Sequence, residues 1–101
     1  MVFVYTTCGK REEAQKLSEM LITNKLAACV NVWPVESCYT WQGAMKCEGE
    51  FVLQLTTLES KLQQIEDLLL SNHTYSTPFV GAVDIRRINR EYKEWMSQVV
   101  E

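Results

Sequence analysis

The stretch that most constrains the fold lies at residues 25–33, where the chain reads Lys-Leu-Ala-Ala-Cys-Val-Asn-Val-Trp. It is almost wholly apolar, carries β-branched and aromatic residues, and ends at Pro34. A short, continuous apolar run that stops at a proline predicts a strand buried on both faces. Because Ala27, Ala28 and Cys29 are small, we expect a helix to lie close over them. The other elements are expected to pack around this strand.

Length and charge bound the class of protein. With 101 residues the chain predicts a single domain over 1–101. A formal net charge of −3 weighs against a nucleic-acid partner, since nucleic-acid binders usually show a basic face. No apolar run approaches the roughly 20 residues of a membrane span, and the N-terminal residues lack the basic region of a signal peptide. We therefore expect a cytoplasmic protein without a membrane span, its four cysteines mainly reduced.

Hydrophobic periodicity predicts the order β-α-β-β-α-β, with one more helix at the end. The expected strands are 2–7, 25–33, 37–41, 44–57 and 79–85. The expected helices are about 11–24, one that begins at Leu58 with Thr57 as its N-cap, and a last one capped by Asn89. This order is the ferredoxin-like arrangement of the α+β class, an antiparallel sheet with two helices on one face. The other sheet face has no cover within one chain, so we expect it to pack on other subunits.

The middle of the chain predicts a long hairpin that projects beyond the domain. Gln42-Gly43 has the composition of a two-residue turn, in which glycine supplies a positive φ. Pro34 cannot donate to a sheet ladder, so we expect the sheet to break or bulge there, and Gly49 marks a second candidate bulge.

A two-residue turn would place two cysteines opposite each other. Trp41 would pair with Ala44, and Cys38 would pair with Cys47 as a non-hydrogen-bonded pair with Cα atoms about 4.5 Å apart. Such a spacing can hold a disulfide or a dithiol metal site. The alternative is two unpaired thiols, since one bulge would shift the register.

Several motifs follow one another over nearly the whole chain. They are Val4-Tyr5-Thr6-Thr7, the run Lys25–Asn31, Tyr39-x-Trp41-x-Gly43, Glu50, Thr57, His73-x-Tyr75-x-x-Pro78 and Asn89-x-x-Tyr92-x-x-Trp95. In these motifs the chain resembles the CutA divalent-cation tolerance family. The resemblance implies a ferredoxin-like subunit in a tight homotrimer, similar to the PII signalling proteins, with long hairpins and sheet edges joined between subunits. It also implies a role in the response to metal ions such as copper, with no firmly assigned reaction.

The chain departs from the family pattern at four positions. Thr56 stands where the family commonly has lysine, and Phe79 stands where an acidic residue often follows the loop proline. Thr74 and Ser76 replace the proline and the acid of the typical His-Pro-Tyr-acid loop. These changes remove one cation and up to two carboxylates from the expected cleft between subunits.

Two residues are candidate metal ligands for copper or another divalent cation. His73 is the only histidine, and imidazole is a good copper ligand. Cys8 lies in the first turn near a helix N-terminus and two cations, a setting that lowers a thiol pKa. The alternative for His73 is a loop-anchoring histidine that hydrogen-bonds the backbone. Cys29 is interpreted as a small buried residue under a helix rather than as a ligand.

Five further residues are candidates for binding a small ligand. They are Tyr39, Trp41, Glu50, Tyr75 and Trp95. The alternative is that these side chains pack a subunit interface.

No nucleophile–base pair is evident, because the only histidine has no serine or cysteine partner in the sequence. We therefore predict a non-enzymatic homotrimer that binds copper or a small ligand at inter-subunit clefts and signals to a protein partner. Two alternatives stay open, a structural trimer without a direct metal role and an uncharacterised enzyme.

Overall fold

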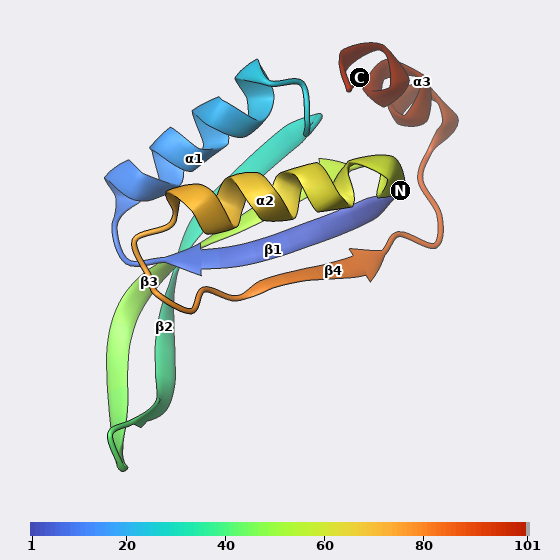
Figure 1. Ribbon diagram of the computed structural model, residues 1–101. Coiled ribbons are helices and arrows are strands. Elements are labelled where there is room, and N and C mark those ends of the chain that lie inside the picture. The colour runs from blue at the N-terminus through green and yellow to red at the C-terminus, as the bar shows by residue number, and fades with distance from the viewer. Residues whose placement is uncertain (101) are drawn as a thin grey trace.

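The computed structural model describes residues 1–100 and shows a four-stranded sheet with helices packed on it. In chain order the elements are β1 (Val2–Cys8), α1 (Arg11–Thr23), β2 (Cys29–Trp41), β3 (Ala44–Thr57), the 3-10 turn η1 (Glu59–Lys61), α2 (Leu62–Asn72), β4 (Val80–Asp84) and α3 (Arg90–Val99). The strand order is β2-β3-β1-β4, and all neighbours are antiparallel. α1 and α2 lie over one face of this sheet (Figure 1). The predicted ferredoxin-like α+β fold is confirmed.

The core lies between the sheet and the two helices α1 and α2. β1 alternates buried and half-buried residues, so Val2 and Val4 face the helices while Phe3 and Tyr5 face the other side. Helical spacing brings the buried residues of the two helices to the same layer. They are Ala14, Leu17 and Leu21 of α1 and Ile65 and Leu69 of α2, and they pack against Leu53 and Leu55 of β3.

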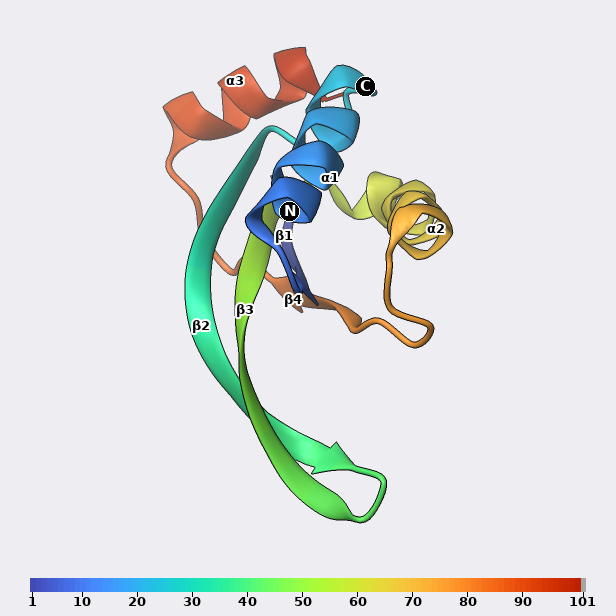
Figure 2. The ribbon, with the colours of Figure 1, turned by 90° about the vertical axis from the view of Figure 1, so that its left-hand side faces the viewer.

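The second sheet face is covered only at one end. α3 lies there, on the side of the sheet away from α1 and α2 (Figure 2). Its Tyr92 interacts electrostatically with Cys29 at the start of β2. Beyond α3 this face carries exposed apolar side chains, with Trp33 38 % exposed and Val83 52 % exposed. The rest of this face, which includes Phe3 and Tyr5, is called the open face below.

The apolar stretch at 25–33 does not form a strand buried on both faces, so that prediction is wrong. β2 begins only at Cys29 and is an edge strand of the sheet. Leu26, Ala27 and Ala28 are buried in the connection from α1, where Ala28 packs against Met96 of α3. The run is apolar because a buried connection needs apolar side chains as much as a central strand does. Cys29 itself is only partly buried.

The expected break at Pro34 and the expected bulge at Gly49 are also wrong. β2 continues through Pro34, which pairs with Phe51, and Gly49 pairs in register with Glu36. Counted from the turn, Pro34 and Phe51 form a non-hydrogen-bonded pair, so the proline nitrogen points away from β3. Because β2 is an edge strand, the missing N–H falls on the outer edge, where a sheet tolerates proline.

The predicted two-residue turn and the projecting hairpin are confirmed. Gln42 has φ 51° and Gly43 has φ 80°, the two positive φ values of a type I′ turn. β2 and β3 extend 13 and 14 residues, and their far ends project from the domain (Figures 1 and 2). The molecule is therefore elongated, with extents of 47, 25 and 21 Å.

Two of the three predicted helix starts are confirmed. α1 begins at Arg11 with Asn24 at its C-cap, and Asn89 occupies the N-cap position of α3. Thr57 does not cap the second helix, because it is the last residue of β3 and its hydroxyl donates to the Leu26 carbonyl at 2.5 Å. A 3-10 turn follows, so α2 starts only at Leu62.

Candidate functional site

The loop between α2 and β4 is anchored by His73. Its Nε2 lies 2.8 Å from the Thr7 carbonyl oxygen, and its Nδ1 lies 3.1 Å from the Tyr75 backbone nitrogen. Because a carbonyl only accepts and a backbone N–H only donates, Nε2 donates to Thr7 and Nδ1 accepts from Tyr75, with Glu13 Oε2 3.5 Å from Nδ1. The side chain is fully buried. The loop-anchoring interpretation of His73 is therefore confirmed, and both ring nitrogens are engaged.

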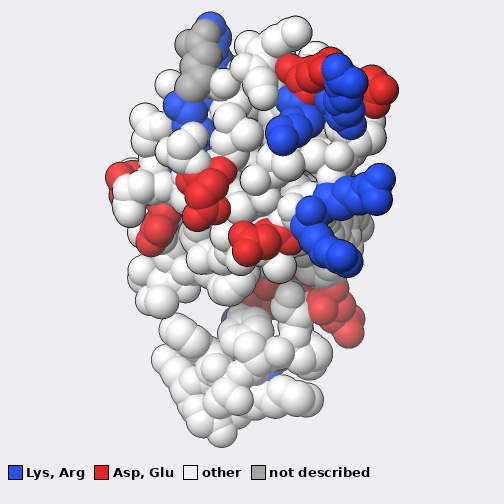
Figure 3. Space-filling model, turned by 90° about the vertical axis from the view of Figure 1, so that its right-hand side faces the viewer, with Lys and Arg blue, Asp and Glu red and all other residues white. Residues whose placement is uncertain are grey.

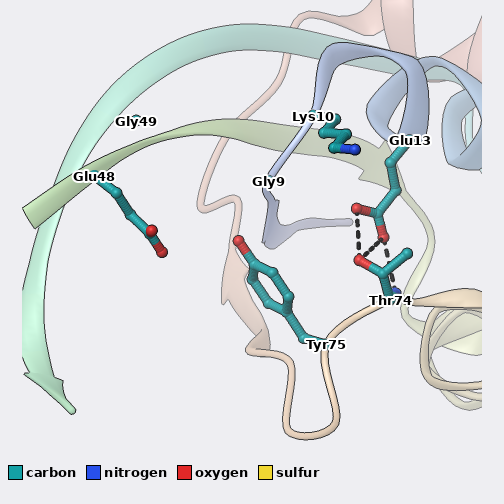
Figure 4. Close-up of a pocket in the computed structure, with 7 residues that line it drawn as sticks. All are labelled: Gly9, Lys10, Glu13, Glu48, Gly49, Thr74 and Tyr75. Atoms are coloured by element: carbon teal, nitrogen blue, oxygen red, sulfur yellow. Dashed lines mark hydrogen bonds between the residues drawn. The ribbon is translucent and has the colours of Figure 1, made fainter. Parts of the chain in front are cut away.

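Thr74 ties the same loop to the first turn of α1. Its backbone N–H and its hydroxyl both donate to the Glu13 carboxylate, each at 2.9 Å (Figure 4). Proline, the usual family residue at this position, has no N–H to donate. The departure to threonine therefore adds two hydrogen bonds that hold the loop against α1.

Tyr75 points from the loop toward β3. Its hydroxyl donates to Glu50 Oε2 at 2.5 Å, and the Glu50 residue is only 8 % exposed. Burial raises the pKa of the Tyr75 hydroxyl, and the Glu50 carboxylate raises it further. A Cβ atom at Gly9 would lie 3.3 Å from the Tyr75 hydroxyl, so glycine there lets the ring approach the backbone (Figure 4).

Cys8 lies beneath this group and is fully buried. Its Sγ is 3.7 Å from the Lys10 carbonyl oxygen, a weak hydrogen bond. Burial raises the pKa of the Cys8 thiol to about 11, and the carboxylates of Glu13 and Glu50 also raise it. The expected lowering of this pKa is wrong, because burial and these two carboxylates outweigh the effect of the Lys10 hydrogen bond.

Two hollows lie between the loop, the first turn and the hairpin, and they share Glu48 and Tyr75. The smaller, of about 360 Å³, is lined by Gly9, Lys10, Glu13, Glu48, Gly49, Thr74 and Tyr75 (Figure 4). The larger, of about 640 Å³, is lined by Thr7, Ser37, Cys38, Tyr39, Trp41, Lys46, Glu48, Glu50, Tyr75, Ser76, Thr77 and Phe79. Together they are called the hairpin cleft below.

Four of the five predicted ligand-binding residues meet in this cleft. Tyr39, Trp41, Glu50 and Tyr75 all line the larger hollow. Trp95 does not, because it lies on α3 and packs edge-on against Tyr92 with ring centroids 5.3 Å apart. The sequence places the first four on three separate segments, and the antiparallel pairing of β2 with β3 and the anchored loop bring them together.

Two charged residues of the cleft, Lys46 and Glu48, were not predicted from the sequence. Glu48 accepts a hydrogen bond from the Tyr39 hydroxyl, which lowers the pKa of Glu48 and raises that of Tyr39. Lys46 Nζ lies 3.5 Å from Glu48 Oε2. The alternation Lys46, Glu48, Glu50 on one face of β3 is the signal that would have found them. No local sequence pattern indicates that Glu13 lines the cleft, since Glu13 lies on α1.

Within residues 1–100, no group of three or more His, Cys, Asp or Glu side chains is arranged to hold a metal ion. The two predicted metal ligands, His73 and Cys8, are both buried, and His73 has no free ring nitrogen. None of the helices in the described part of the chain has the length and apolar character to cross a membrane.

Comparison with known proteins supports one family. The family model for the CutA1 divalent ion tolerance protein matches residues 2–99. The divalent-cation tolerance protein CutA of Archaeoglobus fulgidus is 34 % identical over 98 % of this chain and 97 % of its own length. The chloroplastic protein CutA 1 of Oryza sativa is 38 % identical over 94 % of this chain, which spans 54 % of that longer protein.

Solved structures agree with these relatives. The A. fulgidus protein, described as a periplasmic divalent cation tolerance protein, superimposes with a TM-score of 0.96 at 34 % identity, covering 100 % of both chains. CutA1 from O. sativa gives a TM-score of 0.96 at 36 % identity, covering 99 % of this chain and 93 % of that one. The long hairpin and the terminal helix are therefore shared features of these folds.

Proposed function

This chain belongs to the CutA1 divalent ion tolerance protein family, and on that premise we propose that it is a cytoplasmic homotrimer that binds a small ligand in the hairpin cleft. Binding serves the response to divalent metal ions, and the bound state is passed to a protein partner without catalysis. The observation that carries the proposal is the meeting of Tyr39, Trp41, Glu50 and Tyr75 around one cleft.

The lining of the cleft favours a ligand with a cationic group. Three carboxylates and two ammonium groups line it, those of Glu13, Glu48 and Glu50 and those of Lys10 and Lys46. Aromatic rings add to this preference, because a cation is attracted to the face of an aromatic ring. Trp41 is 58 % exposed and lines the larger hollow, where a ligand could cover it.

The homotrimer is supported by the open face and by the hairpin surface. Trp33 and Val83 leave apolar area on the open face that a single chain does not cover. On the side shown in Figure 3, the projecting hairpin at the bottom of the view carries few charged side chains. The family resemblance implies that hairpins join between subunits, which would place the hairpin cleft at a subunit boundary.

A divalent cation such as copper is the second candidate ligand. It is favoured by the carboxylates of Glu48 and Glu50, which project from the same face of β3. His73 and Cys8 would each have to leave a present hydrogen bond to bind it. We therefore expect copper to bind loosely, and we expect His73→Ala to leave that binding unchanged.

Calorimetric titration of the full chain tests both candidates. The probes are tetramethylammonium, methylguanidinium, Cu(II) and Zn(II), each added to wild type, Glu50→Gln and the distant surface variant Glu59→Gln. We expect saturable binding of an organic cation that Glu50→Gln weakens at least tenfold and Glu59→Gln leaves unchanged. No saturable binding of any probe to an intact trimer would favour the structural trimer. Tight metal binding that His73→Ala abolishes would overturn the preference for an organic cation.

A further inference from the structure

Cys38 and Cys47 face each other across the projecting hairpin. They pair in register between β2 and β3, three residues from the turn on each strand, with Cα atoms 4.1 Å apart. Counted from the turn they form a non-hydrogen-bonded pair, the position at which side chains of neighbouring strands approach most closely. Their sulfurs are joined in a disulfide. The register derived from the sequence is thus confirmed, and the alternative of two unpaired thiols is wrong.

Within a single chain this pair differs from the other two cysteines in its access to solvent. Cys38 and Cys47 are both exposed in one chain, whereas Cys8 is buried and Cys29 is partly buried. Thiol–disulfide exchange proceeds by direct attack of a thiolate on a disulfide sulfur, so it needs access. Exposed disulfides are the labile ones, while buried structural disulfides resist reduction by small thiols.

One residue of the pair borders the hairpin cleft, although strand alternation directs both cysteine side chains to the other face of the hairpin from Tyr39 and Glu48. Cys38 lines the larger hollow, and the next residue along β2 is Tyr39. Cys47 is followed on β3 by Glu48, which accepts the hydrogen bond from the Tyr39 hydroxyl. The disulfide therefore joins the two strands one residue away from a side-chain contact that shapes the cleft.

We propose that Cys38 and Cys47 form a redox modification site that exchanges with the disulfides of small thiols, and that its redox state sets the shape of the hairpin cleft. The exchange itself is independent of ligand binding. Its effect on the cleft rests on the function proposed above.

The exchange proceeds in two steps, in which atoms and electrons balance. The thiolate of one cysteine attacks a small-molecule disulfide, RSSR, forming a mixed disulfide and releasing one RS⁻, which leaves as RSH. The thiolate of the second cysteine then attacks the cysteine sulfur of that mixed disulfide, closing the Cys38–Cys47 bond and releasing a second RSH. Two electrons and two protons pass from the pair to RSSR, and two equivalents of RSH reverse the reaction.

Reduction would remove the disulfide cross-link between the two strands near their tip. The residues beyond the pair would then be held by the backbone ladder and the turn alone, with Trp41 and Met45 already exposed. We expect the reduced hairpin to open more often, so its amides from 38 to 47 should exchange with solvent at least tenfold faster.

The exchange is tested on the folded full chain carrying Cys8→Ala and Cys29→Ala, which leaves only the pair. The protein is equilibrated at a series of ratios of reduced to oxidised glutathione, alkylated, and measured by mass spectrometry. We expect the pair to pass from fully bonded to doubly alkylated within that series, in one two-electron step. A pair that stays bonded in reduced glutathione, or that stays as two thiols in oxidised glutathione, would overturn the proposal. So would a stable mixed disulfide on one cysteine.

The effect on the cleft needs a second measurement. Affinity for tetramethylammonium and amide exchange of 38–47 are compared between the oxidised and reduced protein, with Cys38→Ser/Cys47→Ser as the variant that cannot switch. We expect at least a threefold change in affinity in the switching protein and none in the variant. Exchange chemistry with equal affinities in both states would overturn the coupling alone. Exchange chemistry with no binding in either state would overturn the proposed ligand function and leave the redox site in place.

Discussion

The Tyr75 hydroxyl donates a 2.5 Å hydrogen bond to Glu50, a carboxylate that is almost withdrawn from solvent. One partner belongs to the loop after α2, and the other lies on β3 where the projecting hairpin leaves the sheet. His73 holds the start of this loop against β1 through the Thr7 carbonyl. The hairpin cleft therefore has one wall whose position is set by two hydrogen bonds.

Tyr75→Phe should lower the free energy of unfolding by about 1–3 kcal/mol, because it leaves a nearly buried carboxylate without its donor. Urea unfolding of the variant and wild type measures the loss. Tyr5→Phe is the matched control, since the Tyr5 hydroxyl donates to the neutral Gln54 amide at 2.9 Å. We expect a smaller loss of unfolding free energy in the control. Equal losses in both variants would show that the hydrogen bond to Glu50 stabilises the fold no more than the one to Gln54 does.

His73→Ala should destabilise the loop that carries Tyr75. The Thr7 carbonyl and the Tyr75 backbone N–H would both lose their partner, at a cost of about 1–3 kcal/mol for a buried polar group. Urea unfolding gives the loss, and amide exchange shows whether it is centred on residues 73–78. Thr74→Val is the milder comparison, because it keeps the backbone N–H that donates to Glu13. An unchanged exchange pattern in His73→Ala would show that the histidine does not anchor the loop.

The Cys8 thiol should make the protein lose stability at alkaline pH. Its pKa is raised from the ordinary 9.0 to about 11 in the folded state, so the folded state favours the protonated thiol. Below pH 9 the thiol is protonated in both the folded and the unfolded state, and its contribution to stability is fully present. This stability is lost as pH rises from 9 toward 11, where the unfolded state releases the proton first. The loss is at most about 1.4 kcal/mol per pH unit for one group.

Cys8→Ala separates this effect from that of the tyrosines. Tyr39, Tyr75 and Tyr92 also have raised pKa values, and they add their own loss above pH 10. Urea midpoints between pH 8.5 and 10 therefore report mainly on Cys8. The slope of stability against pH in this window should be shallower in Cys8→Ala than in wild type, and an identical slope would refute the assignment.

Two buried threonines should respond in opposite ways to the same substitution. The Thr57 hydroxyl donates to the Leu26 carbonyl at 2.5 Å, so Thr57→Val should cost about 1–3 kcal/mol by leaving that carbonyl unpaired. The Thr6 hydroxyl oxygen is buried without a hydrogen-bond partner among residues 1–100, so Thr6→Val should be neutral or stabilising. Thermal unfolding of both variants measures the two effects. A loss of stability for Thr6→Val as large as that for Thr57→Val would contradict the assignment of a hydrogen bond to Thr57 and none to Thr6.

Trp33→Glu should shift the proposed homotrimer toward monomers, because it would place a charge on the apolar open face. Light scattering coupled to size exclusion measures the mass over a range of concentrations. Ile22→Glu is the control, since Ile22 is comparably exposed but lies on α1, away from the open face. A trimer that survives Trp33→Glu and dissociates with Ile22→Glu would place the interface on the helical side.

The register of the hairpin could be derived from the sequence because each step in it is local. A type I′ turn at Gln42-Gly43 determines the first pair, and the count outward then places Cys38 opposite Cys47. The expected break at Pro34 failed because whether a proline disturbs a sheet depends on which side its nitrogen faces and on whether its strand has a second neighbour.

The sequence by itself determined the order of the elements, the buried faces of α1 and α2 and the hairpin, because periodicity and turn chemistry act over a few neighbouring residues. Only the tertiary structure decided that β2 is an edge strand, that Cys8 is buried beside two carboxylates, and that Glu13 and Thr74 close the cleft. These relationships join residues far apart in the chain. They depend on strand order and on packing between layers, which no local pattern encodes.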